Sequence, residues 1–154
     1  MTQLKKRSIW TLVIWSIVLI GLCAVFFSEG GAKTFLDGER RVTITRSFLT
    51  AGFIFYFLLL FLTRTGRKAS AVFMDERDVL IAKRALMAGF YVLLIYIFLL
   101  SLILYWYYKL YVITLEMPVG WMWFIGVSSF CLGYISQAAA TLILDSKMGG
   151  NGQG

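Results

Sequence analysis

The hydrophobic positions of this 154-residue chain fall into four long runs, which polar and charged segments separate. The runs cover residues 9–27, 47–63, 85–107 and 119–144, and no lysine, arginine, aspartate or glutamate lies inside any of them. At 1.5 Å of rise per residue, each run is about long enough as a helix to cross a hydrocarbon core of roughly 30 Å. The pattern therefore predicts an all-α membrane protein with four transmembrane helices in an antiparallel bundle.

Composition agrees with membrane insertion and narrows the chemistry. Hydrophobic residues make up 60% of the chain, which is more than the roughly half that is usual in soluble domains. There is no histidine, so haem ligation by imidazole, the common zinc sites and histidine acid–base catalysis are excluded. We therefore expect no catalytic residue, metal or cofactor. The formal charge is +7, and because the basic residues flank the apolar runs, the expected partner is anionic lipid headgroups rather than nucleic acid.

The distribution of basic residues predicts how the chain is threaded. Ten of the fifteen fall on one side of the predicted membrane, namely Lys5, Lys6, Arg7, Arg64, Arg67, Lys68, Arg77, Lys83, Arg84 and Lys147. Short loops rich in lysine and arginine stay in the cytoplasm. We therefore expect a multi-pass protein of the plasma (inner) membrane with both termini in the cytoplasm.

The connections and the chain end complete the predicted layout. In the first outer loop, Asp37-Gly38 is a hairpin-type turn pair between the β-prone residues 34–36 and 42–45, so the pattern allows a small β-hairpin there. Residues 148–154 are rich in glycine and read as a disordered tail. The rest, residues 1–147, forms one domain with helices at about 9–27, 47–63, 76–108 and 119–144.

A helix start is specified in the middle, cytoplasmic loop. Asp75 suits an N-cap, and Glu76 and Asp78 follow it at the positive end of the helix dipole. No breaker follows until after Tyr108, so the helix would be roughly 50 Å long and its first two to three turns would stand in the cytoplasm. The segment is either a capped start with solvated charges or a docking surface for a protein partner. The candidate docking residues are Asp75, Glu76, Arg77, Asp78, Ile81 and Lys83.

The same segment carries a resemblance to a known family. Asp75-Glu76-Arg77-Asp78, followed by Ile81 and Lys83, resembles the D-E-R-[DE]-x-x-I motif of small prokaryotic membrane proteins that are grouped as a family of unknown function. The resemblance covers about 30 residues, from Met74 into the third predicted helix. It implies a multi-pass membrane protein, and it carries no activity and no catalytic residue.

Small residues recur at three- and four-residue steps along the fourth run, at Gly126, Ser129, Gly133, Ser136 and Ala140. Such residues let helix backbones approach closely in lipid, so we expect this packing seam either within one bundle or between copies of the chain. Cys23 and Cys131 differ in predicted depth by more than a disulfide spans. We expect both to be free thiols.

Function is constrained mainly by what the membrane runs lack. Proton-coupled carriers keep an ionisable side chain at membrane depth, whereas Glu29, Glu116 and Asp145 all fall at predicted helix ends. The leading hypothesis is a non-enzymatic accessory or regulatory subunit of a larger membrane system. The alternative is a small homo-oligomeric transporter or channel with the packing seam at its interface.

Overall fold

The computed structural model describes residues 3–28, 32, 39–65, 76–111 and 117–150. Four helices account for nearly all of them: α1 (Gln3–Phe27), α2 (Glu39–Thr65), α3 (Glu76–Tyr111) and α4 (Val119–Gly150). Each contains a stretch long and apolar enough to cross a membrane. The chain is therefore an all-helical, multi-pass membrane protein, as its hydrophobic pattern predicts.

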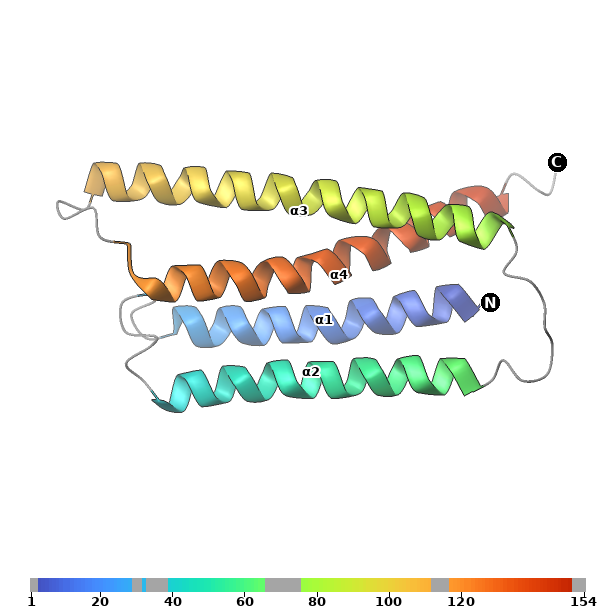
Figure 1. The fold of residues 1–154 in the computed structure, drawn as a ribbon, viewed down its shortest axis with the longest axis horizontal. Helices are drawn as coiled ribbons and strands as arrows, with labels where there is room; N and C mark the ends of the chain where they lie inside the picture. The colour runs from blue at the N-terminus through green and yellow to red at the C-terminus, as the bar shows by residue number, and fades with distance from the viewer. Residues whose placement is uncertain (1–2, 29–31, 33–38, 66–75, 112–116, 151–154) are drawn as a thin grey trace.

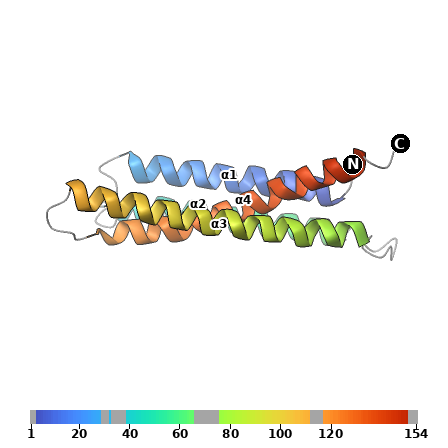
Figure 2. The ribbon, with the colours of Figure 1, turned by 90° about the horizontal axis from the view of Figure 1, so that it is seen from above.

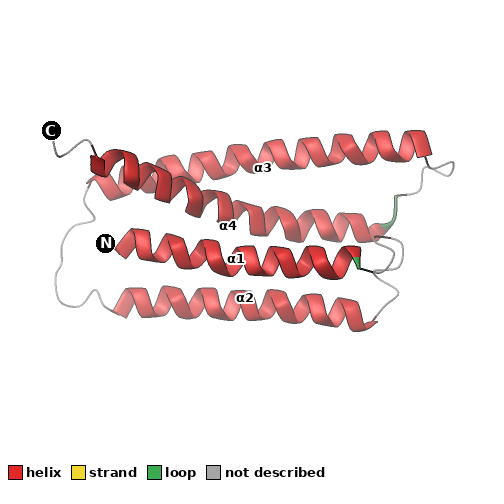
Figure 3. Cartoon of the chain, turned by 180° about the vertical axis from the view of Figure 1, so that it is seen from behind, coloured by secondary structure: helices red, strands yellow, loops and turns green. Residues whose placement is uncertain are grey.

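The helices are arranged as a row whose order differs from their order in the sequence. Extended contacts join α3 to α4, α4 to α1, and α1 to α2, and Figure 1 shows the helices in that order. Figure 2 shows α4 passing obliquely across α3, and Figure 3 shows both marked chain ends at the same end of the row. Consequently α1 and α4 each have two neighbours, whereas α2 and α3 form the edges.

The buried share of each helix follows its place in the row. Within the most apolar window of each helix, 28% of α1 and 22% of α4 is buried, against 11% of α2 and 6% of α3. The edge helices therefore present most of their apolar surface outward. In a bilayer this surface meets acyl chains at no hydrophobic cost, so a row is as acceptable there as a closed bundle.

Close packing in the row depends on small residues and aromatic rings. A Cβ atom on Gly52 of α2 would lie 2.7 Å from Val18 Cγ2 of α1, so only glycine permits this spacing between the two helices. Near the start of α4, Leu22 and Phe26 of α1 pack on Phe124, and the Phe26 and Phe124 rings stack with centroids 4.3 Å apart. Contacts of this kind supply the dispersion energy that holds membrane helices together.

Hydroxyl groups within the helices are satisfied locally. Thr11 donates to the Arg7 carbonyl, Thr63 to that of Leu59, and Thr141 to that of Gln137. These bonds return the hydroxyl to the preceding turn of its own helix, so the group needs no partner from a neighbouring helix. These three hydroxyls thus leave no unpaired donor in the membrane.

Two helices begin earlier than the hydropathy pattern predicts. α1 starts at Gln3 rather than near residue 9, and α2 starts at Glu39 rather than near residue 47. Residues 42–45 are consequently helical, and Thr45 donates to the Arg41 carbonyl. The expectation of a β-strand there is wrong, because packing against α1 and back-bonding outweigh the β-propensity of this stretch. The other half of the expected hairpin, residues 34–36, lies outside the described residues.

Two helices also end later than the hydropathy pattern predicts. α3 begins at Glu76, as predicted, and ends at Tyr111, while α4 continues to Gly150. Residues 148–150 are therefore helical rather than part of a disordered tail, and residues 151–154 lie outside the described residues. Hydropathy marks the lipid-facing part of a helix, whereas backbone hydrogen bonding continues until a breaker intervenes.

Candidate functional site

The contact between α3 and α4 is held by polar side chains at both of its ends. Near the start of α3, Arg77 Nη2 donates to the Asp145 carbonyl at 3.2 Å and lies 3.4 Å from Asp145 Oδ1. Near the other end, the Trp121 indole donates to Tyr108 Oη at 3.1 Å. The ends of α3 are therefore matched to opposite ends of α4. The Arg77 side chain is 38% exposed, so the ion pair is screened and contributes little energy.

Between these ends, two glycines lie at the contact of α3 with α4. A Cβ on Gly89 would lie 3.4 Å from both the Gln137 Cβ and the Gln137 backbone nitrogen. A Cβ on Gly133 would lie 3.0 Å from Leu93 Cδ1. Ala85, one turn before Gly89, is fully buried. At Gly89 there is thus room for a methyl group and little more, as at other small-residue crossings in membranes.

A partly buried polar pair lies between this crossing and the Tyr108–Trp121 end of the contact. Ser128 donates to the Phe124 carbonyl, and its oxygen is 2.7 Å from Tyr96 Oη. Because the Ser128 hydrogen is committed to its own helix, Tyr96 is the donor between the two. The neighbouring Ser129 hydroxyl is buried and has no hydrogen-bond partner among the described residues. Tyr96 therefore fixes the register of α3 on α4 without any charged group.

The candidate docking residues divide into two sets. Arg77 is engaged with Asp145, and Ile81 is fully buried, so the expectation that Ile81 lies on a docking surface is wrong: it anchors α3 within the chain. Glu76 and Lys83 are exposed, and Asp78 is half-buried. Asp75 lies outside the described residues. What remains for a partner at this end is therefore a small charged surface.

The candidate packing seam is also divided. Gly133 and Ser136 face α3, at Leu93 and Gly89 respectively, while Ser129 and Ala140 are half-buried. Gly126 is exposed, and nothing lies within 4 Å of where its Cβ would stand. One end of the seam is thus a contact within the chain, and the other end is open.

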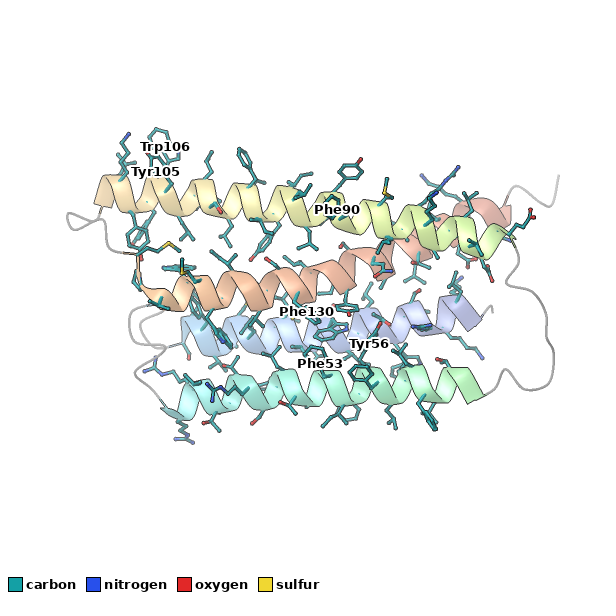
Figure 4. All side chains as sticks on the ribbon, viewed as in Figure 1. Phe53, Tyr56, Phe90, Tyr105, Trp106 and Phe130 are labelled. Carbon is teal, nitrogen blue, oxygen red and sulfur yellow. The ribbon has the colours of Figure 1, made fainter. Side chains whose placement is uncertain are left out.

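An aromatic cluster around Trp15 is the most enclosed part of the protein, and sequence reasoning overlooked it. Trp15 of α1 is fully buried, and four rings surround it, from Phe53, Tyr56, Phe130 and Tyr134. Figure 4 shows Phe53, Tyr56 and Phe130 gathered around α1. One feature of the sequence could have indicated this cluster. Tryptophan favours the membrane interface, whereas Trp15 lies deep in its apolar run.

The groups that could support chemistry are dispersed. Cys23 and Cys131 are both free thiols, as expected. Asp145 stands near the end of α4, while Glu29 and Glu116 lie outside the described residues. Among the described residues, no cluster of histidine, cysteine, aspartate or glutamate could hold a metal ion.

Comparison with known proteins adds no family to this description. The chain matches no family model, no curated protein and no solved structure. The motif-based resemblance at residues 75–83 therefore stays a prediction.

Proposed function

We propose that this chain is a non-enzymatic accessory or regulatory subunit of a larger assembly in the plasma membrane. The observation that carries the proposal is the position of α3, whose one extended contact among the described helices is with α4 and of whose apolar window only 6% is buried. Figure 4 shows Phe90, Tyr105 and Trp106 pointing away from the row. An edge helix of this kind offers a long surface on which another membrane helix can pack.

The chemistry of the chain supports a binding role. There is no histidine, and the charged residues at the start of α3 stand ahead of its apolar surface, with Glu76 and Lys83 exposed. A partner helix that packs along α3 would contact the apolar face over most of its length and these charged residues at the N-terminal end of α3. Charges at such a rim select the partner and its orientation more than they add affinity.

Photo-crosslinking from α3 tests the proposal. With benzoylphenylalanine in place of Phe98, whose side chain is 66% exposed, irradiation of native membranes is expected to attach a second, different protein. The measurement is a mass-shifted band identified by mass spectrometry.

The matched control carries the same probe at Ile20, which is 69% exposed but belongs to α1, a helix that already has two neighbours. No protein adduct is expected there. Adducts only with lipid from Phe98 would contradict the proposal, and adducts with a second copy of the chain would favour the alternative below.

The proposed threading is antiparallel, with both termini in the cytoplasm. The matched ends of α3 and α4 support it, as does the excess of lysine and arginine on one side. Single cysteines in the first turns of α2 and α3 test it, at Arg40→Cys and Glu76→Cys, in a chain without its native thiols. We expect an impermeant maleimide to label the α2 site in intact cells and the α3 site only after permeabilisation. Equal labelling of the two sites would overturn this orientation.

The alternative is a homo-oligomeric transporter or channel, and Gly126 is the observation that favours it. The open space at this residue leaves one end of the small-residue seam free to meet a second copy. Since Gly133 already contacts Leu93 of its own chain, Gly126 is the position at which an oligomer would be sensitive to bulk.

A further inference from the structure

A groove on the outward face of α2 has no role in the packing of the row. It is a shallow, largely open groove of about 470 Å³, and its described lining comes from one face of α2, at Thr43, Arg46, Ser47, Thr50, Ala51 and Ile54. α2 packs extensively on α1 alone, through another face that includes the buried Thr45 and Gly52. The groove therefore opens toward the space that lipid occupies, and its lining changes from polar to apolar along the helix.

Arg46 brings a charge to this groove. Its side chain is exposed, and within the described part of the chain it makes no ion pair. An arginine that faces lipid is costly unless its guanidinium reaches an anion or water. Arg40 and Arg41 precede it in the first turn of α2, where the helix end adds a partial positive charge. Arg46 is the one charged side chain among the described residues that line the groove.

The depth of Arg46 matches that of a lipid phosphate. It lies seven residues after the start of α2 at Glu39, about 10 Å along the axis. The Cα–Cβ bond of a helical residue tilts toward the helix N-terminus, so the guanidinium reaches back toward the headgroup level. Guanidinium groups bind phosphate oxygens through two parallel hydrogen bonds.

The hydroxyl groups that line the groove have a defined hydrogen-bond direction. Ser47 donates to the Thr43 carbonyl at 2.9 Å, and Thr50 donates to the Arg46 carbonyl at 2.8 Å. With their hydrogens used in this way, both oxygens remain available only as acceptors. A ligand that satisfies them must carry hydrogen-bond donors close to its anionic group.

We propose that this groove binds one anionic phospholipid whose headgroup bears hydroxyl donors, of the phosphatidylglycerol kind. Arg46 holds the phosphate, Ser47 and Thr50 accept from the headgroup hydroxyls, and an acyl chain lies along Ala51 and Ile54. Phosphatidylcholine has the phosphate but no hydroxyl or N–H donor and no net charge, so the same groove discriminates against it. The proposal depends on membrane insertion and is independent of any protein partner.

Native mass spectrometry of the full chain in mild detergent tests the site, with phosphatidylglycerol and phosphatidylcholine added in separate titrations. We expect the native chain to retain one phosphatidylglycerol preferentially. Arg46→Gln is expected to weaken that binding by about 10- to 100-fold, the effect of losing a charge-assisted hydrogen-bond pair. Ser47→Ala combined with Thr50→Val is expected to reduce the preference over phosphatidylcholine while leaving phosphate binding in place.

Arg40→Gln is the matched control, since it removes the same charge from the same helix outside the groove. It should change phosphatidylglycerol binding less than threefold, with helical content unchanged in every variant. The proposal is overturned if Arg40→Gln weakens binding as much as Arg46→Gln, which would indicate general charge attraction. It is also overturned if Arg46→Gln binds normally, if the native chain retains both lipids equally, or if excess inorganic phosphate displaces the lipid.

Discussion

Replacement of Trp15 by alanine is expected to cause the largest loss of stability of any single truncation in this protein. Trp15 is fully buried and contacts rings from both α2 and α4, so its removal opens a cavity at the point where three helices meet. Buried aromatic truncations cost about 3–5 kcal/mol in soluble cores. Since lipid removes part of the transfer contribution, we expect roughly 2–4 kcal/mol here, measured by equilibrium unfolding in mixed micelles.

Two further variants make this expectation specific. Ile20→Ala on the same helix shortens a side chain that already faces outward, so it should change the free energy of unfolding by less than about 0.5 kcal/mol. Trp15→Phe should lie between the two, because it keeps an aromatic ring and removes an indole N–H that has no partner among the described residues. If Trp15→Ala is no more destabilising than Ile20→Ala, the aromatic cluster does not hold the row together.

Leucine in place of Gly89 is expected to separate α3 from α4. The new side chain would meet the backbone of α4 at Gln137, which cannot move aside as a flexible side chain can. Overpacking of this kind costs about 1–3 kcal/mol, and α3 has no other extended helix contact to compensate. Cysteines at positions 77 and 145, whose native side chains reach each other through the length of the arginine, should be bridged readily by a short bis-maleimide crosslinker in the parent protein and poorly in Gly89→Leu.

Gly126→Leu is the matched control, because the same substitution enters open space. It should leave the 77–145 crosslink unchanged and slightly favour the helix, since leucine is a better helix former than glycine by about 1 kcal/mol. Efficient crosslinking in Gly89→Leu would contradict the close packing of α3 on α4. Loss of a homo-oligomer in Gly126→Leu, with the crosslink still formed, would support the oligomeric alternative.

The sequence was sufficient to locate the spans but not to arrange them. Uncharged apolar runs such as residues 85–107 have few alternatives to membrane insertion, and they predict four helices. The order of the row could not be predicted, because small residues such as Gly133 indicate that a backbone can approach without specifying which one. Gly52, which lets α2 approach α1, gave no signal beyond its apolar surroundings, and the depth of Trp15 in its run indicated an unusual position without naming the rings that surround it.

The candidate sites, like the fold, combine features that the local sequence predicts with features that depend on helix packing. The charged helix start at Glu76 follows from local capping chemistry, and α3 begins there. Whether each residue of the motif faces solvent or α4 depends on how α3 crosses α4. The burial of Ile81 and the pairing of Arg77 with Asp145 could therefore not be predicted from the sequence. Likewise, Val42 and Ile44 have β-propensity, yet they belong to a helix whose backbone is satisfied internally.

The two edges of the row differ in hydrophobic thickness. The uncharged stretch of α2, residues 47–63, rises about 25 Å, whereas that of α3, residues 85–108, rises about 36 Å. To fit a core of roughly 30 Å, α3 alone would have to lean on the order of 35° from the bilayer normal. Because α3 is tied to α4 at both ends, α3 cannot lean without α4. The mismatch that a shared lean leaves would thicken the bilayer beside α3, whereas the short α2 would thin it at the opposite edge of the row.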